Sequence, residues 1–313
     1  MGDEGVTYVS LRDVLGDFLV EYGKKDVNFV VIDVDLSSST RTIKFAQQFP
    51  DRFFNMGIAE QNAMGVAIGF AISGTMPIIS GFSIFTTGRA WEFIRLVCHD
   101  NLNVKIITTH AGFVGEDGGT HHALEDLSLM GILPNLNILV PIDGIELSQM
   151  LTDAFSTKGP FYIRLPRSAF PPIHDETYKF KRGAIDKLKN GNEICLIGIG
   201  YGSILAYQNV NQLEKELNLS IKILNLSTIK PLESSILTRE LKNMKAVIVI
   251  EEHNSYWGVG SMVAKLAAET LQIPMRFLGV NDLFGQSGSR EDLLVKHGFT
   301  YENLKKLVGE LLD

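Results

Sequence analysis

The chain has 313 residues, enough for two domains of ordinary size, and 45% of them are hydrophobic, as expected for a protein with a sizeable core. The formal net charge is -7 and there is no basic run, which argues against a nucleic-acid-binding or anionic-membrane surface. No apolar run reaches the ~20 residues that a transmembrane helix needs.

The N-terminus and the cysteines indicate the compartment. Residues 1–10 include two acids and lack an apolar segment, so we expect no secretion signal. Cys98 and Cys195 lie in apolar segments far apart in the sequence, which favours two buried free thiols over a disulfide. These features predict a cytoplasmic protein.

The first half of the chain alternates helical patterns with short apolar, β-branched runs. Helices are predicted over residues 11–22, 57–73, 89–99 and 144–155, and strands over residues 28–33, 76–82, 104–109, 137–141 and 161–165. Continuously apolar strands between helices predict a parallel sheet covered on both faces. Ligands of such sheets bind at the carboxyl ends of the strands, which here carry Asp33, Asp35, Phe82, His110 and Arg167.

A break follows the first set of elements. Pro171, Pro172 and the polar stretch 175–192 predict a linker. A second α/β set begins after it, with strands predicted over residues 193–199, 221–226, 246–251 and 275–278 and helices over residues 203–217 and 258–271. We therefore expect an α/β protein of two doubly wound domains, residues 1–172 and 193–313, joined by a linker of residues 173–192. The second domain is smaller and mostly parallel.

Glu60 is the one charged residue in an otherwise apolar helical stretch. Ala63, Met64 and Ala67 follow it at helical spacing, so the carboxylate is predicted to lie on an apolar stripe. Burial favours the protonated form of a carboxyl group, which suits acid–base chemistry. The structural alternative is a helix start, with Gly57 as N-cap and Glu60 at the third helical position.

The loop from His110 to His122 contains many side chains that could take part in binding or catalysis. It holds three histidines, two acids and four glycines after a predicted strand, a density that favours a ligand site over a mobile surface loop. A metal site is a minority alternative because no recognised ligand spacing, such as HExxH, is present. Phe82 and Phe85, at the exit of another strand, could clamp a flat heterocycle, although such pairs more often belong to a core.

Three further residues could bind an anion. Arg12 lies in the first predicted helix, Ser39 follows the acidic strand end, and Arg167 follows the last strand of the first domain. Each alone is typical of a surface, but together at one site they would suit a phosphate group.

Two motifs in the second half carry no assigned chemistry. Gly198, Gly200 and Gly202 fail the GxGxxG pattern because Ser203 occupies the third glycine position, so a tight strand-to-helix turn is favoured. Glu251, Glu252 and His253 are expected to form an interface or a solvated strand end.

Taken together, these motifs resemble the C-terminal half of transketolase. The resemblance rests on residues 54–62 (FNMGIAEQN), Phe82 with Phe85, residues 115–121 (GEDGGTH) and residues 141–144 (PIDG), and it extends over nearly the whole chain. It implies a pyrimidine-binding domain followed by a transketolase C-terminal domain. No GDG motif, which marks the family's diphosphate-binding domain, is present. The chain therefore resembles one subunit of a split transketolase.

The resemblance also implies a cofactor and residues that hold it. The cofactor would be thiamine diphosphate, with Mg²⁺ or Ca²⁺ held by the partner subunit and no metal held by this chain. Glu60 stands at the position of the glutamate that binds N1′ of the aminopyrimidine. Phe82 and Phe85 match the aromatic clamp, and Asp35 matches a buried acid near the cofactor.

Substrate residues carry over in the same way. Asp117 and His121 match positions near the ketose carbonyl, and the phosphate would be bound by Arg12, Ser39, His110 and Arg167. The implied catalytic residues are Glu60, His110 and His121. The family pattern is broken at His122, where many relatives have glutamine. The 110–117 segment is also one residue shorter, as in deoxyxylulose-phosphate synthase, although that enzyme has arginine at position 110 and lacks Glu116.

The function implied is transfer of a two-carbon ketol unit between a ketose phosphate and an aldose phosphate. The partner would be the subunit with the diphosphate-binding domain, in a heterotetramer built on a homodimer. Alternatives are a deoxyxylulose-phosphate synthase-like subunit, a 2-oxoacid dehydrogenase beta-type subunit, and a non-catalytic regulatory or scaffold subunit. The pathway, whether pentose phosphate metabolism or a dedicated sugar route, stays open.

Overall fold

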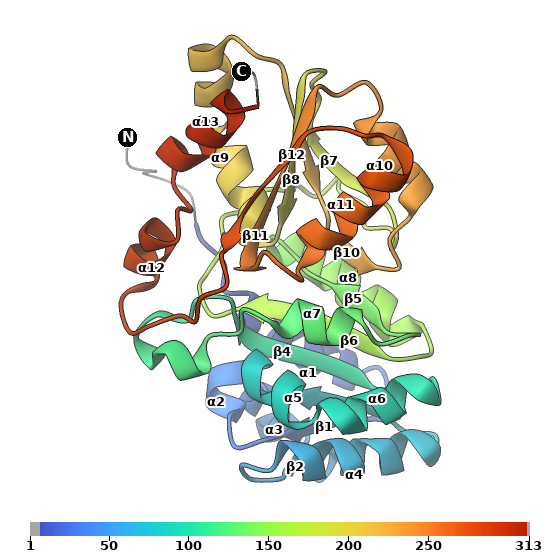
Figure 1. Cartoon of the computed structure of the whole chain (residues 1–313). Coiled ribbons are helices and arrows are strands. Elements are labelled where there is room, and N and C mark those ends of the chain that lie inside the picture. Colours follow the sequence, from blue (N-terminus) through green and yellow to red (C-terminus); the bar gives the residue numbers. More distant parts are fainter. Residues whose placement is uncertain (1–6, 312–313) are drawn as a thin grey trace.

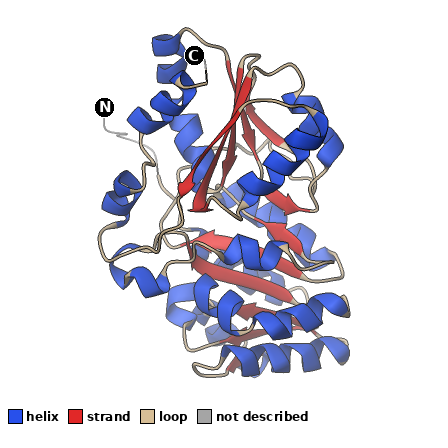
Figure 2. Ribbon diagram, viewed as in Figure 1, coloured by secondary structure: helices blue, strands red, loops and turns tan. Residues whose placement is uncertain are grey.

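The computed structural model describes residues 7–311. Most of the N-terminal stretch for which we expect no secretion signal, residues 1–6, lies outside the described part. Two β-sheets make up the centre of the molecule, one in the lower half and one in the upper half of Figure 1. Helices cover both faces of the sheets, as Figure 2 shows, so the predicted α/β class with two doubly wound units is confirmed.

The first sheet has seven strands in the order β10-β5-β6-β4-β3-β1-β2. They are β1 (Phe29–Asp33), β2 (Phe53–Asn55), β3 (Met76–Ser80), β4 (Lys105–Ala111), β5 (Asn137–Leu139), β6 (Phe161–Pro166) and β10 (Thr228–Lys230). All neighbours pair in parallel except β10 with β5. Every residue of β1, β3, β4 and β6 is buried, which explains why these strands read as continuous apolar runs.

The second sheet has five strands in the order β12-β11-β8-β9-β7. They are β7 (Asp186–Lys189), β8 (Ile194–Ile199), β9 (Ile221–Asn225), β11 (Ala246–Asn254) and β12 (Met275–Val280). Of these described strands, β7 at the edge runs antiparallel and the others are parallel. The glycines after β8 pack tightly, since a Cβ on Gly202 would lie 2.0 Å from the Ile250 carbonyl oxygen. This contact supports the tight-turn interpretation of the Gly198–Gly202 segment.

The helices alternate with the strands. Those of the first half are α1 (Leu11–Gly23), α2 (Ser37–Thr40), α3 (Ile43–Gln48), α4 (Glu60–Ile72), α5 (Ser83–Arg89), α6 (Trp91–His99), α7 (Asp126–Gly131) and α8 (Gly144–Ser156). Those of the second half are α9 (Tyr201–Leu217), α10 (Ser234–Leu241), α11 (Val259–Thr270), α12 (Arg290–Lys296) and α13 (Tyr301–Gly309). None of the helices in residues 7–311 combines the length and hydrophobicity needed to cross a membrane.

Long periodic segments were predicted correctly and short ones were missed. The missed elements are β2, β7, β10, α2, α3, α5, α7, α10, α12, α13 and three 3-10 turns, η1 (Pro50–Arg52), η2 (Gly115–Asp117) and η3 (Gly119–His121). Most have eight residues or fewer, too few to show a period in the sequence. The segment 173–192, expected to be a linker throughout, contains β7, which pairs with β9.

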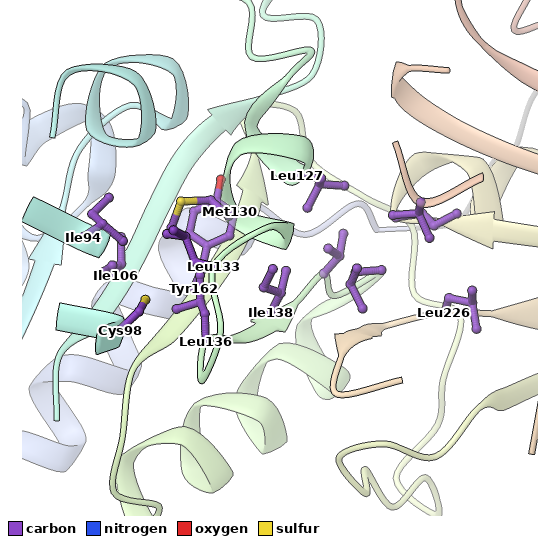
Figure 3. Packing of buried hydrophobic residues seen from close by; sticks show 14 of the residues in the cluster. Ile94, Cys98, Ile106, Leu127, Met130, Leu133, Leu136, Ile138, Tyr162 and Leu226 are labelled. Atoms are coloured by element: carbon purple, nitrogen blue, oxygen red, sulfur yellow. The ribbon is translucent and has the colours of Figure 1, made fainter. Parts of the chain in front are cut away.

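Strand β10 joins the two halves of the chain. It belongs by sequence to the second half, yet Thr228 and Lys230 pair with β5 of the first sheet. Hydrophobic packing continues across the same junction. In Figure 3, Leu127 and Met130 of α7 and Ile138 of β5 lie in one cluster with Leu226, which follows β9. Both cysteines lie in this cluster as buried free thiols, as expected.

A second junction is polar and centres on His174. Its Nδ1 lies 2.8 Å from a carboxylate oxygen of Asp143, the N-cap of α8, and its Nε2 lies 2.8 Å from Asp186 in β7. Burial alone would lower the pKa of His174, but hydrogen bonds to Asp143 and Asp186 outweigh burial and raise it to about 10. Glu146 and Tyr178 also face this ring. The imidazolium therefore ties the first domain to the segment that leads into the second.

We expect the His174 contacts to make stability depend on pH. Because the folded-state pKa is raised above the ordinary value of 6.5, the stabilisation is complete below pH 6.5 and is lost as the pH rises towards 10. The slope is at most about 1.4 kcal/mol per pH unit. Urea unfolding of wild type and His174→Gln between pH 7 and 9.5 measures it. The difference in free energy should shrink as pH rises, whereas the exposed His99→Gln should leave the wild-type slope unchanged. A constant difference for His174→Gln would contradict the assignment.

Candidate active site

Glu60 is buried, as predicted, with 4% of its surface exposed, but its place in the helix differs from the prediction. Ala59 is the N-cap, so Glu60 is the first residue of α4 and makes no capping hydrogen bond. Gly57 adopts φ +69° and its carbonyl accepts a hydrogen bond from Ala59, so residues 57–59 form a turn before the helix. The alternative, a capping glutamate at the third helical position, is wrong.

Arg89 is the partner of Glu60 that sequence analysis missed. Its Nη1 donates to both carboxylate oxygens of Glu60, at 3.0 and 3.2 Å. The guanidinium also lies over the ring of Phe85, 4.4 Å from the centroid. Phe85 and Arg89 are four residues apart in α5, so they share a face of that helix. That spacing would have revealed the pair, had α5 been predicted as a helix.

The aromatic pair lies at the start of α5 instead of in a strand exit. Strand β3 ends at Ser80, and Phe82 is the N-cap of α5. The rings of Phe82 and Phe85 are inclined by 20°, with centroids 6.2 Å apart. Phe82 stacks on His110 at 3.8 Å, while Phe85 meets the edge of His121 at 5.1 Å. One series of contacts therefore runs from the buried carboxylate through two aromatic rings to two histidines.

The surroundings of His110 disfavour its charged form, and its backbone conformation is uncommon. It is buried, adopts φ +62°, and its Nδ1 lies 2.8 Å from the Thr109 hydroxyl. Burial, followed by the charges of Arg12 and Arg167, lowers its pKa to about 3. The ring is therefore neutral near pH 7. A non-glycine residue at positive φ is uncommon and is enriched at functional sites.

Arg12 and Arg167 both lie close enough to His110 for their charges to lower its pKa. Arg12 donates from Nη1 to the Ser39 carbonyl at 2.9 Å, and burial together with Arg41 and Arg167 lowers its pKa. Arg167 donates to the Val114 carbonyl at 2.8 Å, and its Nε lies 3.6 Å from Asp117. Two guanidinium groups thus lie near the neutral His110, an arrangement that attracts anions.

The acid at the end of β1 needs a correction. Asp35 was expected to be a buried acid, but in this chain it is exposed and contacts the side-chain amide of Asn55. The buried acid is Asp33, which accepts hydrogen bonds from the Leu36 amide and from the hydroxyls of Thr40 and Thr42. Asp33 organises the turn, and Asp35 adopts φ +67°.

The loop from His110 to His122, which we call the active-site loop, folds back on itself. Gly112 and Ala123 exchange backbone hydrogen bonds at its base, and η2 and η3 shape its tip. A cleft of about 660 Å³ lies beside it, lined by Asp117, Thr120 and His122 and by residues 284–287 of the second domain. His122 is buried edge-on against Phe113, and neither ring nitrogen has a hydrogen-bond partner within residues 7–311.

A buried ion pair follows directly after the loop. Arg164 of β6 donates to both oxygens of Asp126, the first residue of α7, at 2.7 and 3.2 Å. It also donates to the carbonyls of Ala123 and Glu252. Glu251, Glu252 and His253 are all buried, so the alternative of a solvated strand end is wrong. Glu252 and His253 accept hydrogen bonds from the Phe113 and Leu127 amides of the first domain, as expected for an interface. Glu251 instead accepts from the Val259 and Gly260 amides of its own domain.

Family models match both parts of the chain. Residues 7–172 match the transketolase pyrimidine-binding domain, and residues 183–304 match the transketolase C-terminal domain. The match to the first model alone includes more than half of the chain.

Relatives that align over nearly their whole length are also transketolase proteins by description. The chain is 38% identical over 310 residues to a Methanocaldococcus jannaschii protein assigned as a transketolase C-terminal section, with 97% of this chain and 96% of the relative aligned. It is 32% identical to a subunit of the apulose-4-phosphate transketolase of Actinobacillus succinogenes, with 96% of this chain and 98% of the relative aligned.

A solved structure described as a split-gene transketolase in an inactive beta4 tetramer superimposes with a TM-score of 0.88, at 38% identity, and covers 98% of this chain and 99% of its own. The fold, the two matched domains and these full-length relatives agree. This chain belongs to the transketolase family and consists of its pyrimidine-binding and C-terminal domains.

Proposed function

We propose that this chain is the C-terminal subunit of a thiamine diphosphate-dependent transketolase. It moves a two-carbon ketol unit between ketose and aldose phosphates. The observation that carries the proposal is the contact series from Glu60 and Arg89 through Phe85 and Phe82 to His110 and His121. This set of contacts joins a buried carboxylate, aromatic surfaces and polar groups, which supports the binding of a cofactor with an aminopyrimidine ring.

The residues of this chain fit the cofactor. Glu60 is a buried carboxylate paired with Arg89, whose side chain is half-exposed, so it can exchange that partner for N1′ of the aminopyrimidine and share a proton there. His110 stacks on Phe82, which is buried, and Arg89 lies over Phe85, which is partly exposed, so Phe85 is the more accessible ring for stacking once Arg89 moves. When bound, thiamine diphosphate supplies the nucleophilic carbon that takes up and releases the ketol unit.

The other residues bind the sugar. Asp117 and His121 on the active-site loop hydrogen-bond the hydroxyls near the ketose carbonyl. Arg12, Arg167 and Ser39 hold the terminal anion, and the neutral His110 donates a hydrogen bond to it. In this proposal Glu60, His110 and His121 are the catalytic residues.

The partner in this proposal is a subunit with the diphosphate-binding domain, which holds the cofactor tail through Mg²⁺ or Ca²⁺. The assembly is a heterotetramer built on a homodimer. Several relatives are themselves described as transketolase subunits, including a 6-deoxy-6-sulfo-D-fructose transketolase subunit of a Clostridium species at 31% identity. The proposed domains are residues 1–172 and 193–313, and the protein is cytoplasmic.

A second candidate is a deoxyxylulose-phosphate synthase-like activity. The chain is 33% identical to the synthase of Desulfotalea psychrophila, of which it covers 48%. Arg12, Arg167 and His110 would bind the aldose phosphate in both reactions, so the donor distinguishes them. Release of carbon dioxide from pyruvate and glyceraldehyde phosphate would identify the synthase. A 2-oxoacid dehydrogenase beta-type subunit would oxidise its 2-oxoacid, and a scaffold subunit would bind no thiamine diphosphate when assembled.

We expect the isolated chain to be inactive. Activity with xylulose 5-phosphate and ribose 5-phosphate should appear only when thiamine diphosphate, Mg²⁺ and a diphosphate-domain subunit are added, because Glu60 and the loop form half of the site. A coupled assay for glyceraldehyde phosphate measures this. Full turnover by the isolated chain would refute partner dependence.

Replacement of Glu60 should remove turnover while leaving the fold intact. In the reconstituted enzyme, Glu60→Ala should lower kcat by roughly 10²- to 10⁴-fold, the usual contribution of a positioned acid–base group. The matched control is Glu92→Ala, which removes an exposed acid of α6 and should leave kcat unchanged. Retained turnover in Glu60→Ala would remove Glu60 from the mechanism.

Loss of Arg12 should weaken binding of phosphorylated substrates selectively. Arg12→Gln should raise KM for a ketose phosphate roughly tenfold or more, because the loss of a hydrogen bond to a charged group weakens binding by about this factor. KM for the unphosphorylated donor hydroxypyruvate should change little. Arg239→Gln, which removes an exposed arginine of α10, is the control. Equal effects on both donors would argue against phosphate binding by Arg12.

A further inference from the structure

The active-site loop is held from outside by the second domain. We propose that Glu252, together with Arg290, is a positioning residue of the active site that fixes the loop carrying Asp117 and His121. This inference rests on the proposed function for its effect on catalysis, but its effect on the loop stands on the structure alone.

The two oxygens of the Glu252 carboxylate accept hydrogen bonds from different partners. Oε1 accepts a hydrogen bond from the backbone N–H of Phe113, in the active-site loop, at 2.8 Å. Oε2 accepts one from Nη2 of Arg290, the first residue of α12, at 2.7 Å. Glu252 itself is 4% exposed. A charged acceptor at this depth binds a backbone amide strongly, because water cannot compete for it.

The loop backbone rests directly against this carboxylate. A Cβ on Gly112 would lie 2.6 Å from the carboxylate carbon of Glu252, and Gly112 adopts φ +73°. Only glycine combines that backbone conformation with so close an approach. Arg290 is fixed in turn, because its guanidinium lies over the ring of Tyr201, 4.4 Å from the centroid.

The tip and the far end of the loop also meet the second domain. A Cβ on Gly119 would lie 2.4 Å from the carbonyl oxygen of Gly285. At the far end, the N–H of Asn254 donates to the Leu124 carbonyl at 2.7 Å. Contacts inside the loop are local: a pair of backbone hydrogen bonds joins Gly112 to Ala123, and the two 3-10 turns are short. Such turns have weak intrinsic stability, so the second domain supplies much of the order.

The expected consequence is specific to the substrate. Glu60 and Phe85 lie on α4 and α5, whereas Glu252 meets the base of the active-site loop. Loosening the loop should therefore weaken ketose binding and turnover without weakening cofactor binding. A displacement of about 1 Å in a site can cost a hundredfold in rate, so we expect Glu252→Ala to lower kcat/KM for the ketose phosphate roughly ten- to a hundredfold.

The test has two independent measurements. In the isolated chain, hydrogen–deuterium exchange over residues 112–122 should accelerate at least tenfold in Glu252→Ala and in Arg290→Gln, with the Phe113 amide most affected. In the reconstituted enzyme, both variants should lower kcat/KM for the ketose phosphate, with the dissociation constant of thiamine diphosphate within twofold of wild type. The double variant should add little to Glu252→Ala, because the two side chains act as a unit.

Glu240→Ala is the matched control. It removes a half-buried carboxylate of the same domain that pairs with Lys187 and Lys222, far from the loop in the fold, and should change neither measurement. Unchanged loop exchange in Glu252→Ala would overturn the inference, as would an equal loss of cofactor affinity. If Glu252→Ala fails to fold, Arg290→Gln decides alone, since it retains Glu252 but removes the guanidinium that holds its carboxylate against the Phe113 amide. Accelerated exchange in an assembly without transketolase activity would support the role in holding the loop and refute the proposed function.

Discussion

The buried ion pair between Arg164 and Asp126 is the constraint on which the rest of the structure depends. Removing two charges from water is costly, and the cost is recovered only when every polar atom finds a partner. Asp126 also accepts a hydrogen bond from the Tyr162 hydroxyl at 2.6 Å, and Arg164 also donates to the carbonyls of Ala123 and Glu252. Satisfying both charges therefore requires β6, α7 and the end of β11 to meet in a single arrangement.

The chemistry of the site follows from that arrangement. The pair lies directly after the active-site loop, which therefore closes between β4 and α7, and His110 at its start lies near Arg12 and Arg167. The two halves of the site differ in the exposure of their polar groups. Burial keeps His110 neutral, while Glu60 stays next to Arg89, whose side chain is 52% exposed. In the proposed function, the buried His110 belongs to the half that would bind the sugar, and the buried Glu60 with its partly exposed partner Arg89 belongs to the half that would bind the cofactor.

The two domains are more interdependent than a linear domain map suggests. Strand β10 completes the first sheet, His174 bridges α8 and β7, and Glu252 reaches the active-site loop. Each contact joins residues far apart in sequence, and the hydrophobic cluster of Figure 3 continues across the same boundary. The second domain thus contributes to the geometry of a site whose candidate catalytic residues all lie in the first.

The sequence by itself determined the α/β class, the long helices and buried strands, and most of the candidate site residues. Period and continuous hydrophobicity are local signals, and the motifs around Glu60 and His121 are contiguous. It also predicted the burial of Glu60, whereas phosphate binding by Arg12 and Arg167 stays a prediction. Only the tertiary structure decided the partner of Glu60, the exposure of Asp35, the short strands β2, β7 and β10, and the role of Glu252. Each of these depends on a contact between segments distant in the chain, and the free energy of such contacts arises from burial that no local pattern records.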